Sequence, residues 1–163
     1  MIPILIHPFE PVYNEHSRIL ILGTFPSVAS REENFFYGHP RNRFWHLIST
    51  LTNNDLPRSI EDKKALLLKE GIALWDVLKS CDIEKSSDSS ITNPVPNDLN
   101  EIFNKARIKA VFTNGNKAQE LYKKFIYPKT GFQSICLPST SPANAGYNMD
   151  RLKKEWSRIL EYL

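Results

Sequence analysis

The sequence of 163 residues contains only two cysteines, Cys81 and Cys136, which lie far apart and form no CxxC pair. This number and spacing exclude a disulfide framework and a site in which cysteines alone ligate zinc or an iron–sulfur cluster. No apolar run approaches the length of a membrane span, and the opening stretch MIPILIHPFEP lacks the basic segment of a secretory signal. We therefore expect a cytoplasmic protein whose two thiols stay reduced.

The motifs of several common enzyme classes are also missing. There is no GxGxxG or GxxxxGK[ST], so the phosphate cradles of dinucleotide and P-loop sites are absent, and there is no GxSxG or HExxH. His39 and His46 could share a helix face, but no acidic third ligand is spaced to join them. The sequence predicts a site that uses neither a metal nor a cofactor.

The composition is that of an ordinary globular protein. With 41% hydrophobic and 24% charged residues, the chain is expected to form one domain over residues 1–163. The net charge of +3 is too small to indicate a nucleic-acid partner by itself.

Apolar segments alternate with helical patterns along the chain. Strands are predicted over 18–23, 72–78, 108–115 and 133–137, and helices from 41 onward and over 59–71, 96–106, 116–127 and 149–163. The segment 85–98, rich in Ser, Asn and Pro, is predicted to be a long loop. The alternation predicts an α/β fold, a three-layer αβα sandwich with a central, mostly parallel sheet of about four strands.

Polar segments follow three of these strands. They are GTFPS (23–27), TNG (113–115) and PSTSPANAG (138–146), and they should converge because ligands bind beyond the carboxyl ends of parallel strands. The stretch NFFYGHPRNRFW (34–45) adds five aromatic rings and the carboxamide of Asn42. A ring can stack on a flat heterocycle, an amide can pair with its edge, and Ser- and Gly-rich loops can bind phosphates. These features predict a pocket that reads a base on a nucleic-acid strand.

The motifs GTFPS, YGHPRNRFW and LPSTSPAN, in this order, resemble the uracil-DNA glycosylase superfamily, and most closely the hypoxanthine (deoxyinosine)-DNA glycosylases. The resemblance extends from about Arg18 to Asn144. It implies a monofunctional, monomeric enzyme of base excision repair whose partner is DNA containing a deaminated base. The enzyme would flip out hypoxanthine, or uracil or xanthine, and hydrolyse its N-glycosidic bond.

The resemblance also implies roles for individual residues. Tyr37 matches the stacking aromatic, whereas the neighbouring rings of Phe35, Phe36, Phe44 and Trp45 are expected in the core. Mismatch-specific relatives carry a catalytic Asn immediately before the Pro of the first motif, where this chain has Phe25. The candidate catalytic amide is therefore Asn42 of the HPxN segment, with a helix N-cap as its alternative role.

The remaining candidates surround these two residues. The backbone N–H groups of Gly23, Thr24 and Phe25 are expected to stabilise an anionic base, and Asn114 is expected either to read the base or to form a turn. His39 is a candidate donor to the leaving base or a structural brace. Contacts to the DNA backbone are expected from Ser27, Ser139, Thr140, Ser141, Ala143 and Asn144, with Ala143 in the place of a bulkier wedge.

Two alternatives remain at this point. One is a mismatch-specific uracil-DNA glycosylase, against which Phe25 argues. The other is a non-catalytic nucleic-acid-binding module of the same fold, against which the presence of both Tyr37 and Asn42 argues.

Overall fold

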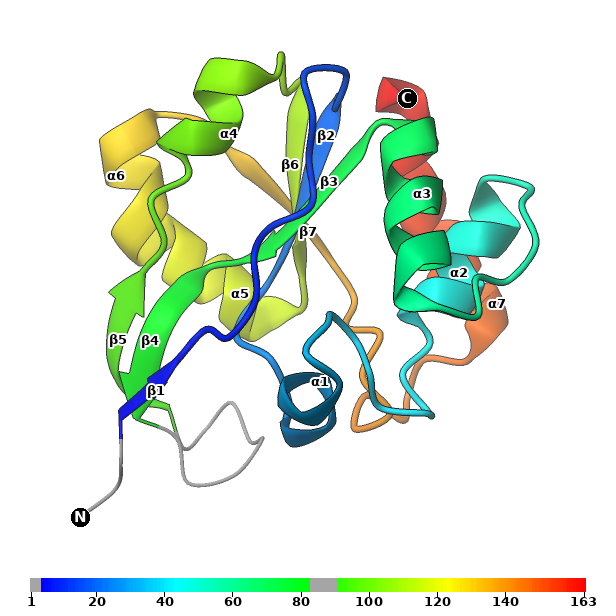
Figure 1. The fold of residues 1–163 in the computed structure, drawn as a ribbon, viewed down its shortest axis with the longest axis horizontal. Helices are drawn as coiled ribbons and strands as arrows, with labels where there is room; N and C mark the ends of the chain where they lie inside the picture. The colour runs from blue at the N-terminus through cyan, green and yellow to red at the C-terminus, as the bar shows by residue number, and fades with distance from the viewer. Residues whose placement is uncertain (1–3, 83–90) are drawn as a thin grey trace.

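The computed structural model describes residues 4–82 and 91–163. At its centre is a parallel sheet with the strand order β3-β2-β6-β7, seen in Figure 1. The strands are β2 (Ile19–Gly23), β3 (Ile72–Asp76), β6 (Ala110–Asn114) and β7 (Ser134–Leu137). Every residue of β2, β3 and β6 is buried, as expected of strands covered on both faces. The prediction of a central parallel sheet of four strands is confirmed.

Helices cover both faces of this sheet and complete the predicted three-layer sandwich (Figure 1). One layer contains α4 (Asn100–Lys105), α5 (Asn116–Leu121), the π-helix η2 (Tyr122–Ile126) and α6 (Tyr127–Thr130). The other contains α2 (Phe44–Leu51), α3 (Ile60–Glu70), α7 (Met149–Trp156) and the 3₁₀-helix η3 (Ser157–Tyr162). The ends of α3 are those that the sequence predicts: Ser59 accepts the Asp62 N–H, and Gly71 follows with φ 76°.

A second, antiparallel sheet was not predicted. It has the order β1-β4-β5 and consists of β1 (Ile4–Ile6), β4 (Leu78–Asp82) and β5 (Thr92–Pro96). The predicted loop over 85–98 is therefore wrong for the residues of β5, and its part up to residue 90 lies outside the described residues. Pro94 and Pro96 fit this strand because it lies at the edge of its sheet, where a missing N–H breaks no ladder. The predicted strand over 72–78 likewise ends earlier, at Asp76, and the chain then enters the second sheet.

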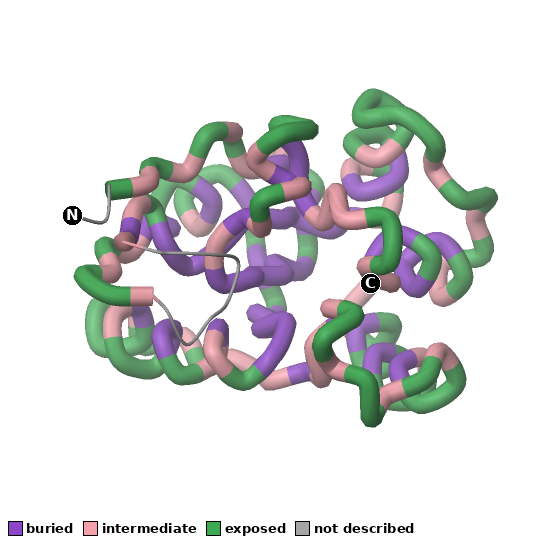
Figure 2. Tube along the Cα trace, turned by 90° about the horizontal axis from the view of Figure 1, so that it is seen from below, coloured by how far each residue is buried: buried purple, intermediate pink, exposed green. Residues whose placement is uncertain are grey.

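A short helix, α1 (Val28–Glu33), interrupts the loop predicted after β2. Ser27 begins it by accepting the Ser30 N–H at 3.1 Å. Figure 2 shows that buried residues concentrate in the middle of the molecule, while exposed residues mark the outer turns. The aromatic residues assigned to the core, Phe35, Phe36, Phe44 and Trp45, are all buried, as predicted. Among the described residues, no helix has the length and apolar character needed to cross a membrane.

Candidate active site

A cavity of about 580 Å³ opens at the carboxyl edge of the parallel sheet, within the size range of small-molecule sites. Its walls come from the ends of β2, β3 and β6, the loop after β7, and the segment between α1 and α2. The strand register brings these ends together, with Gly23 opposite Asp76 and Asn114 opposite Leu137. The three polar loops selected from the sequence do converge here.

Most of the predicted site residues line this cavity, namely Gly23, Thr24, Phe25, Ser27, Tyr37, Asn42, Asn114, Ser139, Thr140, Ser141 and Ala143. His39 and Asn144 do not. His39 is only half-buried, and its Nδ1 accepts the Arg41 N–H at 3.1 Å, in the turn before α2. Asn144 donates from Nδ2 to the Ser139 carbonyl at 3.0 Å and lines a neighbouring cavity. Both side chains therefore support the loops around the cavity.

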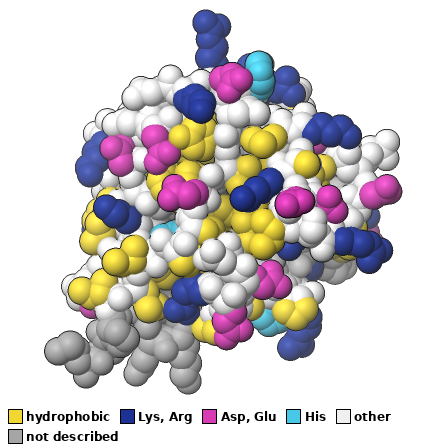
Figure 3. All heavy atoms as spheres, viewed as in Figure 1, with side chains coloured by type: hydrophobic (Ala, Val, Ile, Leu, Met, Phe, Trp, Pro, Cys, Tyr) yellow, Lys and Arg dark blue, Asp and Glu magenta, His cyan; other side chains and the backbone are white. Residues whose placement is uncertain are grey.

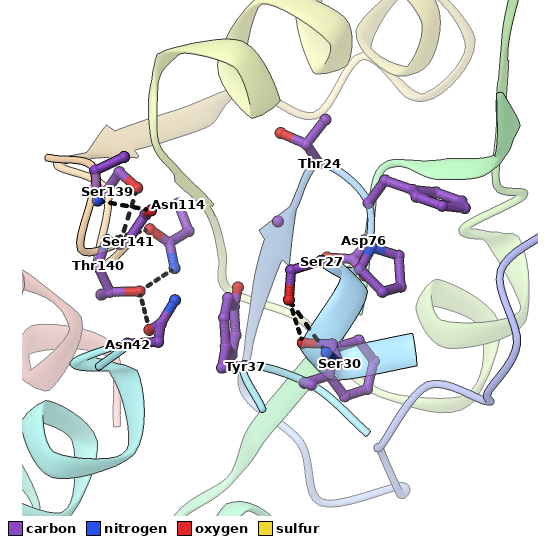
Figure 4. A pocket seen from close by; sticks show the side chains of 15 residues that line it. Thr24, Ser27, Ser30, Tyr37, Asn42, Asp76, Asn114, Ser139, Thr140 and Ser141 are labelled. Carbon is purple, nitrogen blue, oxygen red and sulfur yellow. Dashed lines mark hydrogen bonds between the residues drawn. The ribbon is translucent and has the colours of Figure 1, made fainter. Parts of the chain in front are cut away.

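One wall of the cavity is a chain of hydrogen bonds through Thr140 (Figure 4). Asn114 accepts the Thr140 N–H at 3.0 Å and donates from Nδ2 to Thr140 Oγ1 at 3.0 Å. Thr140 Oγ1 in turn donates to Asn42 Oδ1 at 2.8 Å. The backbone N–H groups of Thr140 and Phe44 can only donate, so the amide atoms that they meet are the oxygens of Asn114 and Asn42.

Asn42 has its carboxamide oriented by a second bond. Its Oδ1 also accepts the Phe44 N–H at 3.0 Å, at the first residue of α2. The N-cap of α2 is Arg43, so the N-cap role considered for Asn42 is wrong, and Asn42 instead closes a turn immediately before the helix. Its Nδ2 has no hydrogen-bond partner among the described residues and points into the cavity between Thr140 and Tyr37 in Figure 4. The same side chain can thus hold the turn before a helix and present two N–H groups to a ligand.

Tyr37 is held in an unusual backbone conformation. Its φ of 53° lies in the left-handed region, which costs a bulky residue about 1–2 kcal/mol. Its ring stacks on Phe44 with a centroid distance of 4.2 Å and an interplanar angle of 25°. The hydroxyl is buried and no described residue makes a hydrogen bond to it; burial, followed by the charge of Asp76, raises its pKa, and the nearby Asn114 opposes this shift. The surroundings therefore fix a neutral phenol ring at the cavity wall despite the backbone strain.

Arg43 connects α2 to the loop after β7, a role that sequence reasoning missed. Its guanidinium donates to the carbonyl oxygens of Thr140 at 3.3 Å, Ser141 at 2.7 Å and Asn144 at 3.1 Å, and also to that of Tyr147. Such multiple donation in one plane is specific to arginine. The position of Arg43 next to Asn42 in the HPxNRFW motif could have indicated this role from the sequence.

The serines of this loop use only part of their hydrogen-bonding capacity on the protein. Ser139 Oγ accepts the Ser141 N–H at 3.1 Å, and Ser141 Oγ accepts the Ala143 N–H at 3.2 Å. Each O–H hydrogen remains able to donate to a ligand. Trp156 braces the start of the loop by donating from Nε1 to the Pro138 carbonyl at 2.9 Å.

Asp76 is a second residue that sequence reasoning missed. It ends β3, lines the cavity and accepts a hydrogen bond from His7 Nε2 at 2.8 Å. The available signal was an acidic residue inside the apolar run IALWDVL. Over residues 4–82 and 91–163, no group of three or more His, Cys, Asp or Glu side chains could hold a metal ion.

Comparison with known proteins places the chain in a family. A family model described as the uracil DNA glycosylase superfamily matches residues 10–163. A protein named hypoxanthine DNA glycosylase from Methanosarcina acetivorans is 35% identical over 158 residues, covering 94% of this chain and 97% of the relative. Another of that name from Methanosarcina barkeri is 34% identical over 138 residues, covering 83% and 86%.

The fold agrees with this assignment. The solution NMR structure of a candidate uracil DNA glycosylase from Methanosarcina acetivorans matches with a TM-score of 0.80 at 32% identity, covering 95% of this chain and 96% of that one. The chain therefore belongs to the uracil DNA glycosylase superfamily and is a DNA glycosylase, an enzyme that hydrolyses N-glycosyl bonds.

Proposed function

We propose that this glycosylase is monofunctional and acts as a monomer in base excision repair, removing hypoxanthine first and uracil or xanthine second. The observation that carries the proposal is that one cavity contains both the ring of Tyr37 and the unpaired amide nitrogen of Asn42. The two Methanosarcina relatives, both named hypoxanthine DNA glycosylase, support hypoxanthine as the preferred base. The enzyme swings the base out of the duplex at a cost of a few kcal/mol, which is lowest for a mispaired base.

Tyr37 stacks on the flipped base. One face of its ring is covered by Phe44, so the base meets the opposite face. Fixing the ring before DNA arrives lowers the cost of ordering it on binding.

Asn42 orients the attacking water. Its Oδ1 is occupied by Thr140 and Phe44, so an Nδ2 hydrogen donates to the water oxygen. One lone pair of the water then remains to attack the anomeric carbon. If the base departs first as an anion, the sugar passes through an oxocarbenium-like state that water attacks readily. The proton that the water loses neutralises the departed base, so no strong general base is required.

The departing base gains negative charge, and fixed N–H dipoles stabilise it. We assign this role to the backbone N–H groups of Gly23, Thr24 and Phe25 and to the remaining N–H of Asn114.

The loop after β7 contacts the DNA backbone. The O–H groups of Ser139 and Ser141 donate to phosphates, and Thr140 supports them through its bond to Asn42. Ala143 stands at the cavity rim where a wedge would fill the gap in the duplex. Because its side chain is small, the enzyme favours mispaired or single-stranded bases, which flip at lower cost.

The test is cleavage of end-labelled duplexes that differ only in one base: inosine, uracil, xanthine or adenine. Each is incubated with the protein and then heated in alkali, which breaks the strand at an abasic site. We expect breaks at inosine at the highest rate. Breaks at uracil alone would favour the mismatch-specific alternative, and binding without breaks would favour the non-catalytic module.

A further inference from the structure

Asp76 is an acidic residue on the cavity floor to which the mechanism above assigns no role. It is 4% exposed and lies opposite Gly23 in the parallel pairing of β3 with β2. A flipped nucleotide enters base first, because its sugar stays attached to the DNA outside. A side chain this deep in the cavity therefore faces the base, whereas the anomeric carbon stays nearer the mouth.

The two carboxylate oxygens of Asp76 have different surroundings. Oδ2 accepts from His7 Nε2 at 2.8 Å. The Phe9 N–H points at the other ring nitrogen of His7, Nδ1, at 3.5 Å, so Nε2 carries the hydrogen that Asp76 receives. The His7 side chain is itself 4% exposed, with its ring 4.6 Å from Phe9 and 5.9 Å from Phe25 between centroids. Oδ2 is therefore held in place by a buried donor.

Oδ1 accepts no hydrogen bond from any of the residues that the structure describes. It lies against Gly23, where an added Cβ would come within 2.4 Å of it. A glycine at this position is thus required for the carboxylate to keep its place. The result is an acceptor at the cavity wall that no described residue occupies and that a ligand in the cavity can pair with.

We propose, building on the function proposed above, that Oδ1 of Asp76 determines specificity by accepting the ring N–H next to the carbonyl of a deaminated base. Deamination of adenine to hypoxanthine changes N1 from an acceptor into an N–H donor, and deamination of cytosine to uracil does the same at N3. A carboxylate only accepts, so it pairs with the deaminated base and meets a repelling lone pair on the parent base. One oxygen atom thus reads the change that deamination makes in both a purine and a pyrimidine.

Asp76 acts on selection and does not assist departure of the base. Its negative charge opposes the charge that develops on the leaving base, so the N–H dipoles of Gly23 to Phe25 carry that stabilisation. Guanine also has an N1–H, so its rejection falls to groups that meet its 2-amino group. The role of His7 is to position the Asp76 carboxylate.

The test compares two substrates that differ only at this contact: deoxyinosine and 1-methyldeoxyinosine, in which a methyl group replaces the N1 hydrogen. Single-turnover cleavage and duplex binding are measured for both with the full chain. The wild type is expected to prefer inosine strongly. In Asp76→Ala the preference is expected to fall on the order of 10- to 100-fold, the effect of losing a buried bond to a charged acceptor.

The preference is a ratio, so a general loss of activity does not affect it. Asp150→Ala, which removes an exposed carboxylate in the first turn of α7, is the matched control and should keep the wild-type ratio. Asp76→Asn keeps the shape of the side chain and serves if Asp76→Ala does not fold. Its amide N–H opposes the N1–H, so the ratio should fall with it too.

An unchanged ratio in the Asp76 variants, with both substrates losing equally, would show that Asp76 is only structural and would overturn the inference. If the wild type cleaves no inosine, the proposed function fails, and the binding ratio of the two uncleaved duplexes still decides the role of Asp76.

Discussion

Two side chains at the cavity carry structural and functional roles at the same time. Asn42 accepts the first N–H of α2 through its oxygen and offers its nitrogen to the cavity. Tyr37 stacks on Phe44 and is held at a positive φ. Backbone strain of this kind persists only where the surroundings determine it, and it is common at functional sites.

Two substitutions of Tyr37 should distinguish the contribution of its ring from that of its hydroxyl. Tyr37→Phe keeps the stacking face and removes a buried hydroxyl that has no partner, so cleavage of inosine DNA should be retained and the midpoint of thermal unfolding should not fall. Tyr37→Leu removes the aromatic face, and single-turnover cleavage should fall roughly 10- to 100-fold, because stacking on one base contributes about 1–3 kcal/mol. Equal activity of the Phe and Leu variants would show that the ring does not stack on the base.

The two thiols should differ in reactivity. Burial raises the pKa of Cys81 to about 11, and the nearby Asp82 charge adds to the shift, whereas Cys136 is half-exposed. Since the thiolate is the reactive form and a raised pKa depletes it, only about one Cys81 in a thousand is ionised at pH 8. Titration with a disulfide reagent at pH 8 should modify Cys136 first and Cys81 only on unfolding. Cys136→Ser should remove the fast phase, and a fast phase that survives would contradict the assignment.

The sequence predicted part of this site and not the rest, for physical reasons. Tyr37 and Asn42 were selected because the motif YGHPRNRFW resembles that of the hypoxanthine-DNA glycosylases. Asp76 was not predicted as a site residue, because a single acidic residue at the end of an apolar strand matches no motif. Only the strand register shows that it lies opposite Gly23. His39 was selected for its residue type, but the turn at Pro40 leaves it outside the cavity.

At the scale of elements, the connection between α2 and the loop after β7 determines the shape of the cavity. Arg43 donates to several carbonyl oxygens of that loop, and Trp156 holds its first residue. The indole of Trp45 holds the other wall by donating to the Phe36 carbonyl at 3.1 Å. Side chains in and next to two helices, α2 and α7, thus hold both walls of the cavity.

Arg43→Lys should loosen the loop without unfolding the protein. A lysine ammonium cannot reach several carbonyls from one plane, so a loss of stability of about 1–3 kcal/mol is expected. Hydrogen exchange should accelerate at the amides of Thr140, Asn144 and Tyr147, while the amides of β2 stay protected. Arg151→Lys is the matched control, because its guanidinium holds one carbonyl of the same loop, that of Gly146, from the exposed side. Unchanged exchange in Arg43→Lys would show that the loop holds its shape without this contact.

The predicted strands and helices were correct where the hydrophobic pattern of the sequence matches the burial of the element. Every residue of β2, β3 and β6 is buried inside the sandwich, so the sequences of these strands are distinctive. The errors lie in the second sheet, which was not predicted, and at α1, which is too short to show a period. In β5, prolines are tolerated because no further strand pairs with it.

At the scale of the whole molecule, the net charge is small, and both signs of charge share the face seen in Figure 3. On the face seen in Figure 3, Lys and Arg side chains are interspersed with Asp and Glu, and the net charge of the chain is +3. This face therefore has no continuous basic surface to which a phosphate backbone could bind. We expect binding to depend on the hydroxyl and N–H groups around the cavity mouth.

We propose that residues 1–163 unfold as one domain. Trp45, Trp75 and Trp156 are buried and lie in α2, β3 and α7, so tryptophan fluorescence reports on the packing of one helix layer against the sheet. Far-UV circular dichroism reports on all layers, and the two signals should give the same midpoint in a denaturant titration. Separate midpoints would show that parts of the molecule unfold independently.

The central claim is that Asn42 holds the attacking water at a base bound in this cavity, and single-turnover cleavage of an inosine duplex by Asn42 variants tests it most directly. Asn42→Asp keeps an acceptor for the Phe44 N–H and loses the N–H donors, whereas Asn42→Ala loses both. We predict that both variants still bind the duplex and that cleavage falls at least roughly 100-fold in each, the usual effect of removing a positioned catalytic group. Cleavage at the wild-type rate by either folded variant would contradict the account.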